Sequence, residues 1–131
     1  VPMITPEIET HLYPYLAQIC NNQKCPSILI NGIANHVHIL CGMSRTLTIA
    51  ELVEELKTNS SKWLKTKSPE LTRFSWQNGY GVFSVDWQNA DHVKAYIATQ
   101  KVHHAKVTFE DEYRKLLHDF GIPFDERYVW D

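Results

Sequence analysis

The chain has 131 residues, of which 44% are hydrophobic and 21% charged, a balance that excludes the disordered, fibrous and membrane-spanning classes of protein. A chain of this length buries about two-thirds of the surface that it exposes when unfolded, so it can form one core without disulfides. The net charge of −2 excludes a protein that coats DNA through general positive charge, because neutralising phosphates requires an excess of Lys and Arg.

The three cysteines, Cys20, Cys25 and Cys41, are an odd number and form no CxxC pair, which favours reduced thiols over a disulfide framework. No apolar stretch approaches the ~20 residues that cross a bilayer. The N-terminal residues also lack the basic and then apolar pattern of a signal peptide. We therefore expect a cytoplasmic protein that has no membrane partner.

The first predicted element is a helix with Thr5 as its N-cap and Pro6 at the first helical position, where a missing N–H has no cost. The apolar residues that follow recur at helical spacing and predict one core-facing stripe, formed by Ile8, Leu12, Tyr15, Leu16 and Ile19. Two short apolar runs, residues 27–33 and 37–42, then predict a pair of closely connected strands.

A second helix is predicted from Thr48 to about Leu64. Thr48 and Glu51 match the T-x-x-E capping box. The apolar residues at helical spacing predict a buried stripe, formed by Ile49, Leu52, Val53, Leu56 and Trp63.

The remaining segments predict one strand and two helices. Residues 74–85 indicate a loop that enters a strand of Val82, Phe83 and Val85, because Gly79 and Gly81 permit tight backbone geometry. Helices are predicted at about residues 90–103 and 108–120. This order of elements predicts a single α+β domain over residues 1–131, in which helices pack on an antiparallel sheet.

Two histidines, His36 and His38, flank Val37 in the second predicted strand. Because side chains alternate along a strand, both imidazoles point to one face while Val37 and Ile39 point to the other. Two imidazole nitrogens side by side suit a divalent metal ion. The alternative is a pair of hydrogen-bonded polar residues on an open sheet face, which is the more common explanation of an isolated HxH motif.

Tyr96 and Gln100 lie four residues apart in the third predicted helix and therefore share one face. The carbonyl oxygen of Gln100 can supply a third metal ligand and leave positions open for phosphate oxygens and water. The Tyr96 hydroxyl is then a candidate nucleophile that forms a covalent phosphotyrosine. Tyr80 competes for this role, but only Tyr96 shares a face with a candidate ligand. Without the histidines, a core aromatic and a solvent-facing amide explain the two residues better.

Positive charge clusters in residues 57–73, where aromatic side chains are interleaved. This combination is typical of surfaces that follow a nucleic-acid backbone and stack bases, and its candidate DNA-binding residues are Lys57, Lys62, Trp63, Lys65 and Arg73. A solvated helix face is an equally good interpretation. His103 and His104 follow the tyrosine helix and are candidates for a DNA contact or for a capping or surface role.

Taken together, these segments resemble the HUH single-strand DNA transposases of the one-tyrosine class, including the related REP-associated tyrosine transposases. The matching segments run in the expected order over nearly the whole chain: Asn31-Gly32, His36-Val37-His38-Ile39-Leu40, Lys57-Thr58-Asn59-Ser60-Ser61-Lys62-Trp63, Phe74-Ser75-Trp76-Gln77-Asn78-Gly79-Tyr80-Gly81-Val82-Phe83-Ser84, Tyr96-Ile97-Ala98-Thr99-Gln100 and His103-His104.

The resemblance implies a ferredoxin-like or RRM-like HUH fold, with His36, His38 and Gln100 as ligands of Mg²⁺ or Mn²⁺ and Tyr96 as the nucleophile. It implies a homodimer in which the tyrosine helix of one subunit can complete the site of the other. The expected substrate is single-stranded DNA with hairpins at the ends of an insertion sequence, cut to a 5′-phosphotyrosine and a free 3′-OH. Members of the family usually begin with a further strand, which this chain is expected to lack.

Two other functions fit part of the pattern. A domesticated or inactive relative that binds hairpin DNA would keep Lys57, Lys62 and Trp63 but would not need Tyr96. A metal-dependent phosphoesterase that uses an activated water would keep His36, His38 and Gln100 without forming a covalent protein–DNA adduct. The intact spacing from Tyr96 to Gln100 favours the transposase.

Overall fold

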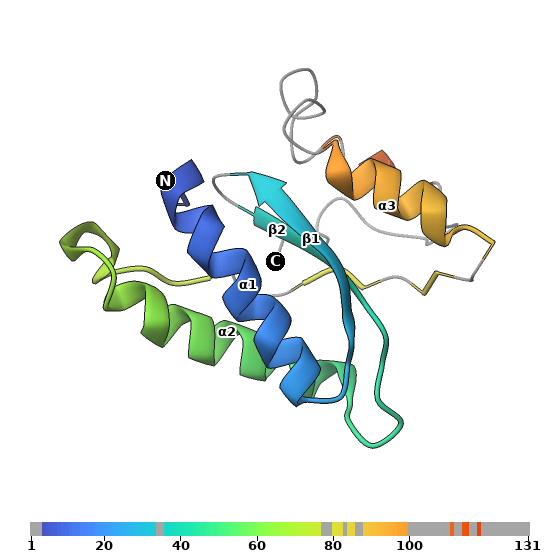
Figure 1. Ribbon diagram of the computed structural model, residues 1–131, viewed down its shortest axis with the longest axis horizontal. Coiled ribbons are helices and arrows are strands. Elements are labelled where there is room, and N and C mark those ends of the chain that lie inside the picture. The colour runs from blue at the N-terminus through green and yellow to red at the C-terminus, as the bar shows by residue number, and fades with distance from the viewer. Residues whose placement is uncertain are drawn as a thin grey trace. The chain divides into compact units, whose positions relative to one another are not determined.

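The computed structural model describes residues 4–33, 36–76, 80–82, 84–85 and 88–99, together with residues 111, 114, 115 and 118. The chain forms two compact units, residues 1–76 and 77–131, and each is described by itself. The elements are α1 (Pro6–Asn22), β1 (Ser27–Ile33), β2 (His36–Cys41), α2 (Ile49–Lys65), the 3-10 helix η1 (Pro69–Leu71) and α3 (Ala90–Ala98) (Figure 1). The fold is α+β, as the sequence predicts. The single domain over residues 1–131 stays a prediction.

Helix α1 begins as predicted, with Thr5 as its N-cap and Pro6 in its first turn. The Thr5 hydroxyl accepts a hydrogen bond from the backbone N–H of Ile8 at 3.2 Å, which satisfies one of the free donors at the helix start. The predicted stripe faces the core: Leu12, Leu16 and Ile19 are buried, and Ile8 and Tyr15 pack against them.

Strands β1 and β2 pair antiparallel, with Asn31 opposite His38 and Gly32 opposite Val37. Helix α1 contacts β1, and the side chains of Ile30, Val37 and Ile39 pack against the core on this side of the pair. Because successive side chains of a strand point to opposite faces, Asn31, His36 and His38 lie on the other face.

Helix α2 begins with the predicted capping box, in which the Thr48 hydroxyl accepts from the Glu51 backbone N–H and the Glu51 carboxylate accepts from the Thr48 backbone N–H, both at 3.1 Å. Its buried face confirms Leu52 and Leu56 of the predicted stripe, and Trp63 packs against the core, but Ser60 and Leu64 were not predicted. It consists of residues spaced four apart, Leu52, Leu56, Ser60 and Leu64. Ile49 is 41% exposed because it lies in the first turn, off this row.

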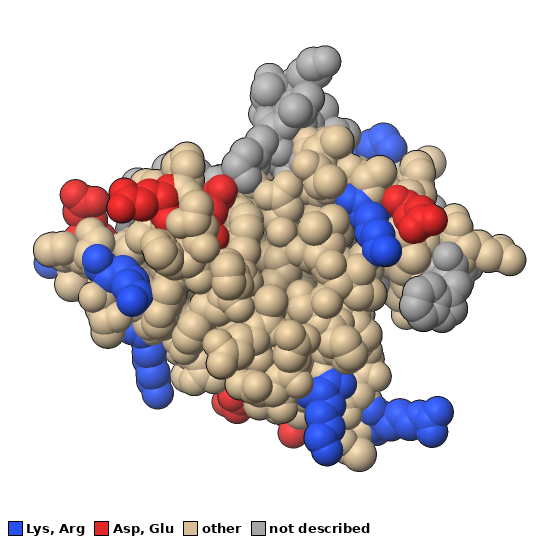
Figure 2. Space-filling view, viewed as in Figure 1, with Lys and Arg blue, Asp and Glu red and all other residues tan. Residues whose placement is uncertain are grey.

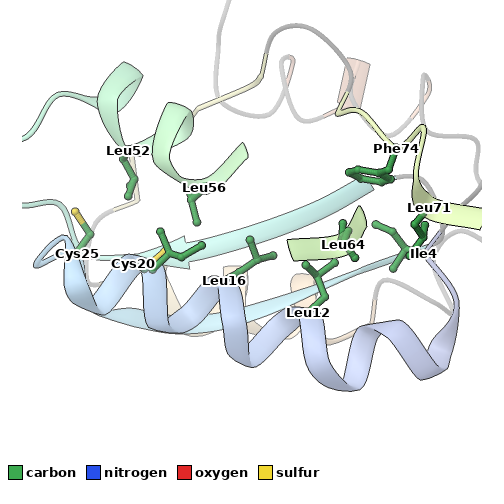
Figure 3. Close-up of a cluster of buried hydrophobic side chains, with 11 residues drawn as sticks. Ile4, Leu12, Leu16, Cys20, Cys25, Leu52, Leu56, Leu64, Leu71 and Phe74 are labelled. Carbon is green, nitrogen blue, oxygen red and sulfur yellow. The ribbon is translucent and has the colours of Figure 1, made fainter. Parts of the chain in front are cut away.

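The core of residues 1–76 lies between α1, α2 and the strand pair. Figure 3 shows its side chains, with Ile4, Leu71 and Phe74 at one end and Cys25 and Leu52 at the other. Ser60 is fully buried, and its hydroxyl donates to the Leu56 carbonyl oxygen and accepts from the Trp76 indole N–H at 2.9 Å. This bond fixes the segment after η1 against α2.

In residues 77–131 the predicted strand at Val82, Phe83 and Val85 is not confirmed. Residues 80–82 and 84–85 are described and have no strand conformation. Among the described residues here, Tyr80 and Val82 are exposed and so contribute nothing to a buried face of the kind that stabilises a strand. Phe83 lies outside the described residues.

Helix α3 begins at Ala90 as predicted and ends at Ala98. The rest of the predicted helix, residues 100–103, lies outside the described residues. Thr99 forms the C-cap of α3, and the Thr99 hydroxyl donates to the carbonyl oxygens of Ala95 and Tyr96 at 3.1 Å. Of the last predicted helix, the four described residues, 111, 114, 115 and 118, are helical. Within the described parts of the chain, no helix has the length and apolar character that a bilayer crossing requires.

Candidate functional site

His36 and His38 occupy the first and third positions of β2, and both side chains are half-buried. Between them Val37 points into the core, which directs the two imidazoles to the opposite face of the strand. The centroids of the two rings lie 5.2 Å apart and the ring planes meet at 88°. The imidazoles are therefore neighbours that can present nitrogen atoms to the same point.

The spacing of the two rings fits one metal ion. With a metal–nitrogen distance of ~2.1 Å, two imidazoles on one ion place their ring centres roughly 5 Å apart, which agrees with the observed 5.2 Å. Among the described residues, no three His, Cys, Asp or Glu side chains form a group that could hold a metal. A third protein ligand would then be an amide or carbonyl oxygen, or would come from outside the described residues. The predicted ligand Gln100 lies outside the described residues.

Gly32 allows β1 to approach β2 beside the histidines. A Cβ atom on Gly32 would collide with the His36 carbonyl oxygen and would lie 2.8 Å from the Val37 Cα atom. Real Cβ contacts of this kind do not occur, so the strands would have to separate if residue 32 carried a side chain. The sequence motif Asn31-Gly32 therefore includes a glycine that the backbone around His36 requires.

Helix α1 supports the same point of the sheet from the core side. Tyr13 is half-buried. Its burial is the main cause that raises the pKa of its phenol, and the charge and hydrogen bond of the Glu9 carboxylate raise this pKa further. A hydrogen bond with the Gly32 backbone acts in the opposite direction on this pKa. Glu9 is 9% exposed. Tyr13 thus links a nearly buried carboxylate to the strand residue opposite Val37, a role that the sequence analysis missed.

Tyr96, the predicted nucleophile, lies in the last turn of α3 and is half-buried, whereas the next residue, Ile97, is 4% exposed. Gln100, His103 and His104 lie outside the described residues. The shared helical face of Tyr96 and Gln100 therefore stays a prediction. Tyr80 is 52% exposed.

The candidate DNA-binding residues on α2 have different surroundings. Lys62 and Lys65 are exposed, as is Arg73 after η1, whereas Lys57 is half-buried and burial lowers the pKa of its ammonium group. Figure 2 shows that on the face it presents the Lys and Arg side chains are separated by uncharged surface.

Trp63 packs within its own chain. The Tyr15 ring of α1 stacks on its indole with centroids 4.8 Å apart and planes 12° from parallel. The Lys67 ammonium nitrogen lies 4.9 Å from the centroid of the same indole, a cation–π distance. These contacts occupy the ring surface that a DNA base would need for stacking, so they favour an anchoring role for Trp63.

The cysteines are free thiols. Cys20 and Cys25 are fully buried, whereas Cys41, at the end of β2, is half-buried. A hydrogen bond with the Cys20 thiol lowers the pKa of Cys41 to about 7, although burial opposes the shift. The same hydrogen bond is the main cause that raises the pKa of Cys20, and burial raises it further. Cys41 is therefore the more reactive thiol of this pair near neutral pH.

Comparisons with known proteins bear on the family and the fold of the chain. Residues 1–100 match the family model for IS200-like transposases. Among solved structures, the chain is similar to the 1.90 Å crystal structure of a candidate transposase from Deinococcus radiodurans, with a TM-score of 0.57 and 21% sequence identity. The similarity covers 76% of this chain and 80% of the other, and it shows a shared fold. No curated protein matches the chain.

Proposed function

Because the chain belongs to the family of IS200-like transposases, we propose that it moves an insertion sequence by cutting and rejoining single-stranded DNA at hairpin-flanked ends. The observation that carries this proposal is the pair of imidazoles on one face of β2, 5.2 Å apart between ring centroids. A nuclease of this kind needs a metal-binding group and a nucleophile. His36 and His38 supply the first, and Tyr96 supplies the second.

His36 and His38 would hold Mg²⁺ or Mn²⁺ together with the carbonyl oxygen of Gln100. The metal, when bound, would withdraw charge from the phosphate and favour attack on phosphorus. The chain's own part is to hold the two imidazoles at their spacing, and Gly32 contributes by allowing β1 to lie close against β2. Imidazole nitrogens favour transition metals over Mg²⁺, so Mn²⁺ is expected to bind more tightly.

Tyr96 would carry the covalent step. Its phenol gives its proton to water, and the phenol oxygen forms a bond to phosphorus while the bond from phosphorus to the 3′ oxygen breaks. The 3′ oxygen leaves and takes a proton from water. The products are a 5′-phosphotyrosine and a free 3′-OH. In the second step a 3′-OH attacks the phosphotyrosine, restores a phosphodiester and releases Tyr96. The phosphate bond energy is kept throughout, so no nucleoside triphosphate is required.

Exposed cations of α2 would hold the DNA strand. Lys62 and Lys65 lie in the last turn of α2, and their ammonium groups are accessible to phosphate oxygens. Trp63 lies between them in the sequence and is stacked on Tyr15 of α1. It would therefore hold this turn of the helix in place while the two lysines contact the DNA backbone.

The proposal is tested by incubating the protein with Mn²⁺ and single-stranded oligonucleotides that span the flanks of its own gene. Wild type and Tyr80→Phe should form a covalent adduct that survives a denaturing gel, whereas Tyr96→Phe should not. Cleavage without an adduct would indicate the water-using phosphoesterase. Hairpin binding without cleavage would indicate the inactive relative. An adduct with Tyr96→Phe would overturn the assignment of the nucleophile.

The proposed homodimer is tested by mixing two inactive variants. If the tyrosine helix of one subunit completes the site of the other, His38→Ala mixed with Tyr96→Phe should recover adduct formation, because one of the two sites in the mixed dimer then carries both groups. Each variant alone should be inactive. Absence of recovery in a mixture shown to contain mixed dimers would contradict sites shared between subunits.

A further inference from the structure

Asn31 lies directly opposite His38 in the β1–β2 pair. Residues opposite each other in an antiparallel pair point to the same face, and their Cβ atoms are about 5 Å apart. The neighbours of Asn31, Ile30 and Gly32, lie on the core side of the strands together with Val37 and Ile39. The Asn31 side chain therefore shares the open face with the two imidazoles, and it is half-buried there.

The two histidines differ in what stands opposite them. His36 is opposite Ile33, an aliphatic residue that has no side-chain hydrogen-bonding group. His38 is opposite a carboxamide, whose oxygen accepts and whose nitrogen donates hydrogen bonds. In this pair of strands, then, only His38 has a polar cross-strand neighbour. Because the side chain of Asn31 is short, the nitrogen of the His38 ring that it can contact is Nδ1, which lies nearer the backbone than Nε2.

An imidazole that binds a metal through one nitrogen carries its proton on the other, and the hydrogen bond made by that second nitrogen sets which one is protonated. We propose that Asn31 is a positioning residue whose amide oxygen accepts a hydrogen bond from Nδ1–H of His38 and leaves Nε2 free for the metal. Asn31 thereby selects the tautomer and the orientation of one ligand before the metal arrives.

This inference rests on the proposed metal-binding role of His38, but its first test requires no metal. The ¹⁵N spectra of the histidine rings in the metal-free protein distinguish the two neutral tautomers of His38 at alkaline pH. Wild type should show His38 with its proton on Nδ1 alone. Asn31→Leu, which keeps the volume and removes the acceptor, should give a mixture of tautomers.

The second measurement is Mn²⁺ affinity by calorimetry. Asn31→Leu should weaken binding by about 10- to 100-fold, as loss of an outer partner of a metal-binding histidine commonly does. Asn31→Asp keeps an acceptor oxygen and should restore both the tautomer and the affinity, which a packing role would not explain. The matched control is Asn59→Leu on α2, where the Asn59 side-chain amide donates to the Glu55 carboxylate at 3.0 Å; neither readout should change.

A single Nδ1–H tautomer of His38 that persists in folded Asn31→Leu would overturn the proposal. So would an Asn31→Asp variant that is folded, as its circular dichroism would show, but has the mixed tautomers of Asn31→Leu. If wild type binds no Mn²⁺ while the tautomers still follow residue 31, the metal-dependent function fails and the positioning role stands. The two failures are therefore distinguishable.

Discussion

Gly32 lies directly across the strand pair from Val37, the residue that separates the two histidines. A side chain at position 32 would meet the backbone of His36 and Val37, and backbone atoms cannot rotate away as side chains do. The spacing of the two imidazoles therefore depends on a residue that contributes no functional group.

Replacing Gly32 with Ala should destabilise the protein by roughly 1–3 kcal/mol, the usual cost of forcing extra volume into a packed region. The free energy of unfolding, measured in urea, checks this value. Mn²⁺ affinity should fall as well, because separated strands move His36. Gly42→Ala is the matched control, since a Cβ atom there would approach only the Pro26 ring, at 3.3 Å. Equal effects of the two substitutions would contradict this role of Gly32.

Replacing either His36 or His38 with Ala should lower Mn²⁺ affinity by about 100-fold or more, because loss of an outer-shell partner alone costs 10- to 100-fold. Calorimetry at fixed pH measures the change. His11, an exposed histidine of α1, serves as the control, and His11→Ala should bind Mn²⁺ like wild type. Wild-type Mn²⁺ affinity in both His36→Ala and His38→Ala would contradict the proposed metal site.

Replacing Lys62 and Lys65 together with Ala should weaken binding to a single-stranded oligonucleotide and reduce its dependence on salt. Each lost phosphate contact lowers the slope of log affinity against log salt by about 0.7, so the double variant should lose about 1.4. Fluorescence anisotropy over a range of KCl concentrations gives the slope. Arg45→Ala, at an exposed cation before α2, should leave it unchanged. A double variant with the wild-type slope would show that DNA binds elsewhere.

The reactivity of Cys41 should depend on pH with a midpoint at about 7, where its thiol ionises. Because the Cys20 hydrogen bond stabilises the thiolate, Cys20→Ala should shift the midpoint upward, toward the ordinary value of 9.0. The rate of alkylation by iodoacetamide, followed by peptide mass spectrometry, measures both midpoints. Cys25→Ala should retain the wild-type midpoint for Cys41. A Cys41 midpoint near 9 in wild type would contradict the hydrogen bond.

The first half of the fold was predictable because its signals are local. Thr5 and Pro6 fix the start of α1, and the reciprocal bonds of Thr48 and Glu51 fix the start of α2. The alternation of side chains along a strand likewise predicted that His36 and His38, on either side of Val37, point to the same face of β2. Capping involves residues within one helical turn, and alternation involves residues within one strand. The sequence alone therefore shows where the helices begin and which strand residues share a face.

What the sequence did not predict depends on contacts between elements. The burial of Ser60 requires Trp76, sixteen residues away, to donate to its hydroxyl. The sequence favours Trp63 as a base-stacking residue, but the Tyr15 ring of α1 stacks on its indole. Asn31 became a candidate only with the strand register, which places it opposite His38. The strand predicted at Val82 is not confirmed among the described residues, and Val82 itself is exposed.

The most direct test of the central claim is the identity of the residue that carries the DNA. Trypsin cuts after Lys94 and Lys101 and releases Tyr96 as the only tyrosine of residues 95–101, whereas Tyr80 falls in residues 74–94. After reaction with a cleavable oligonucleotide and digestion with nuclease and trypsin, mass spectrometry should find a nucleotide phosphate on the peptide of residues 95–101. The same modification on residues 74–94, or cleaved DNA with no modified peptide, would contradict a Tyr96 nucleophile.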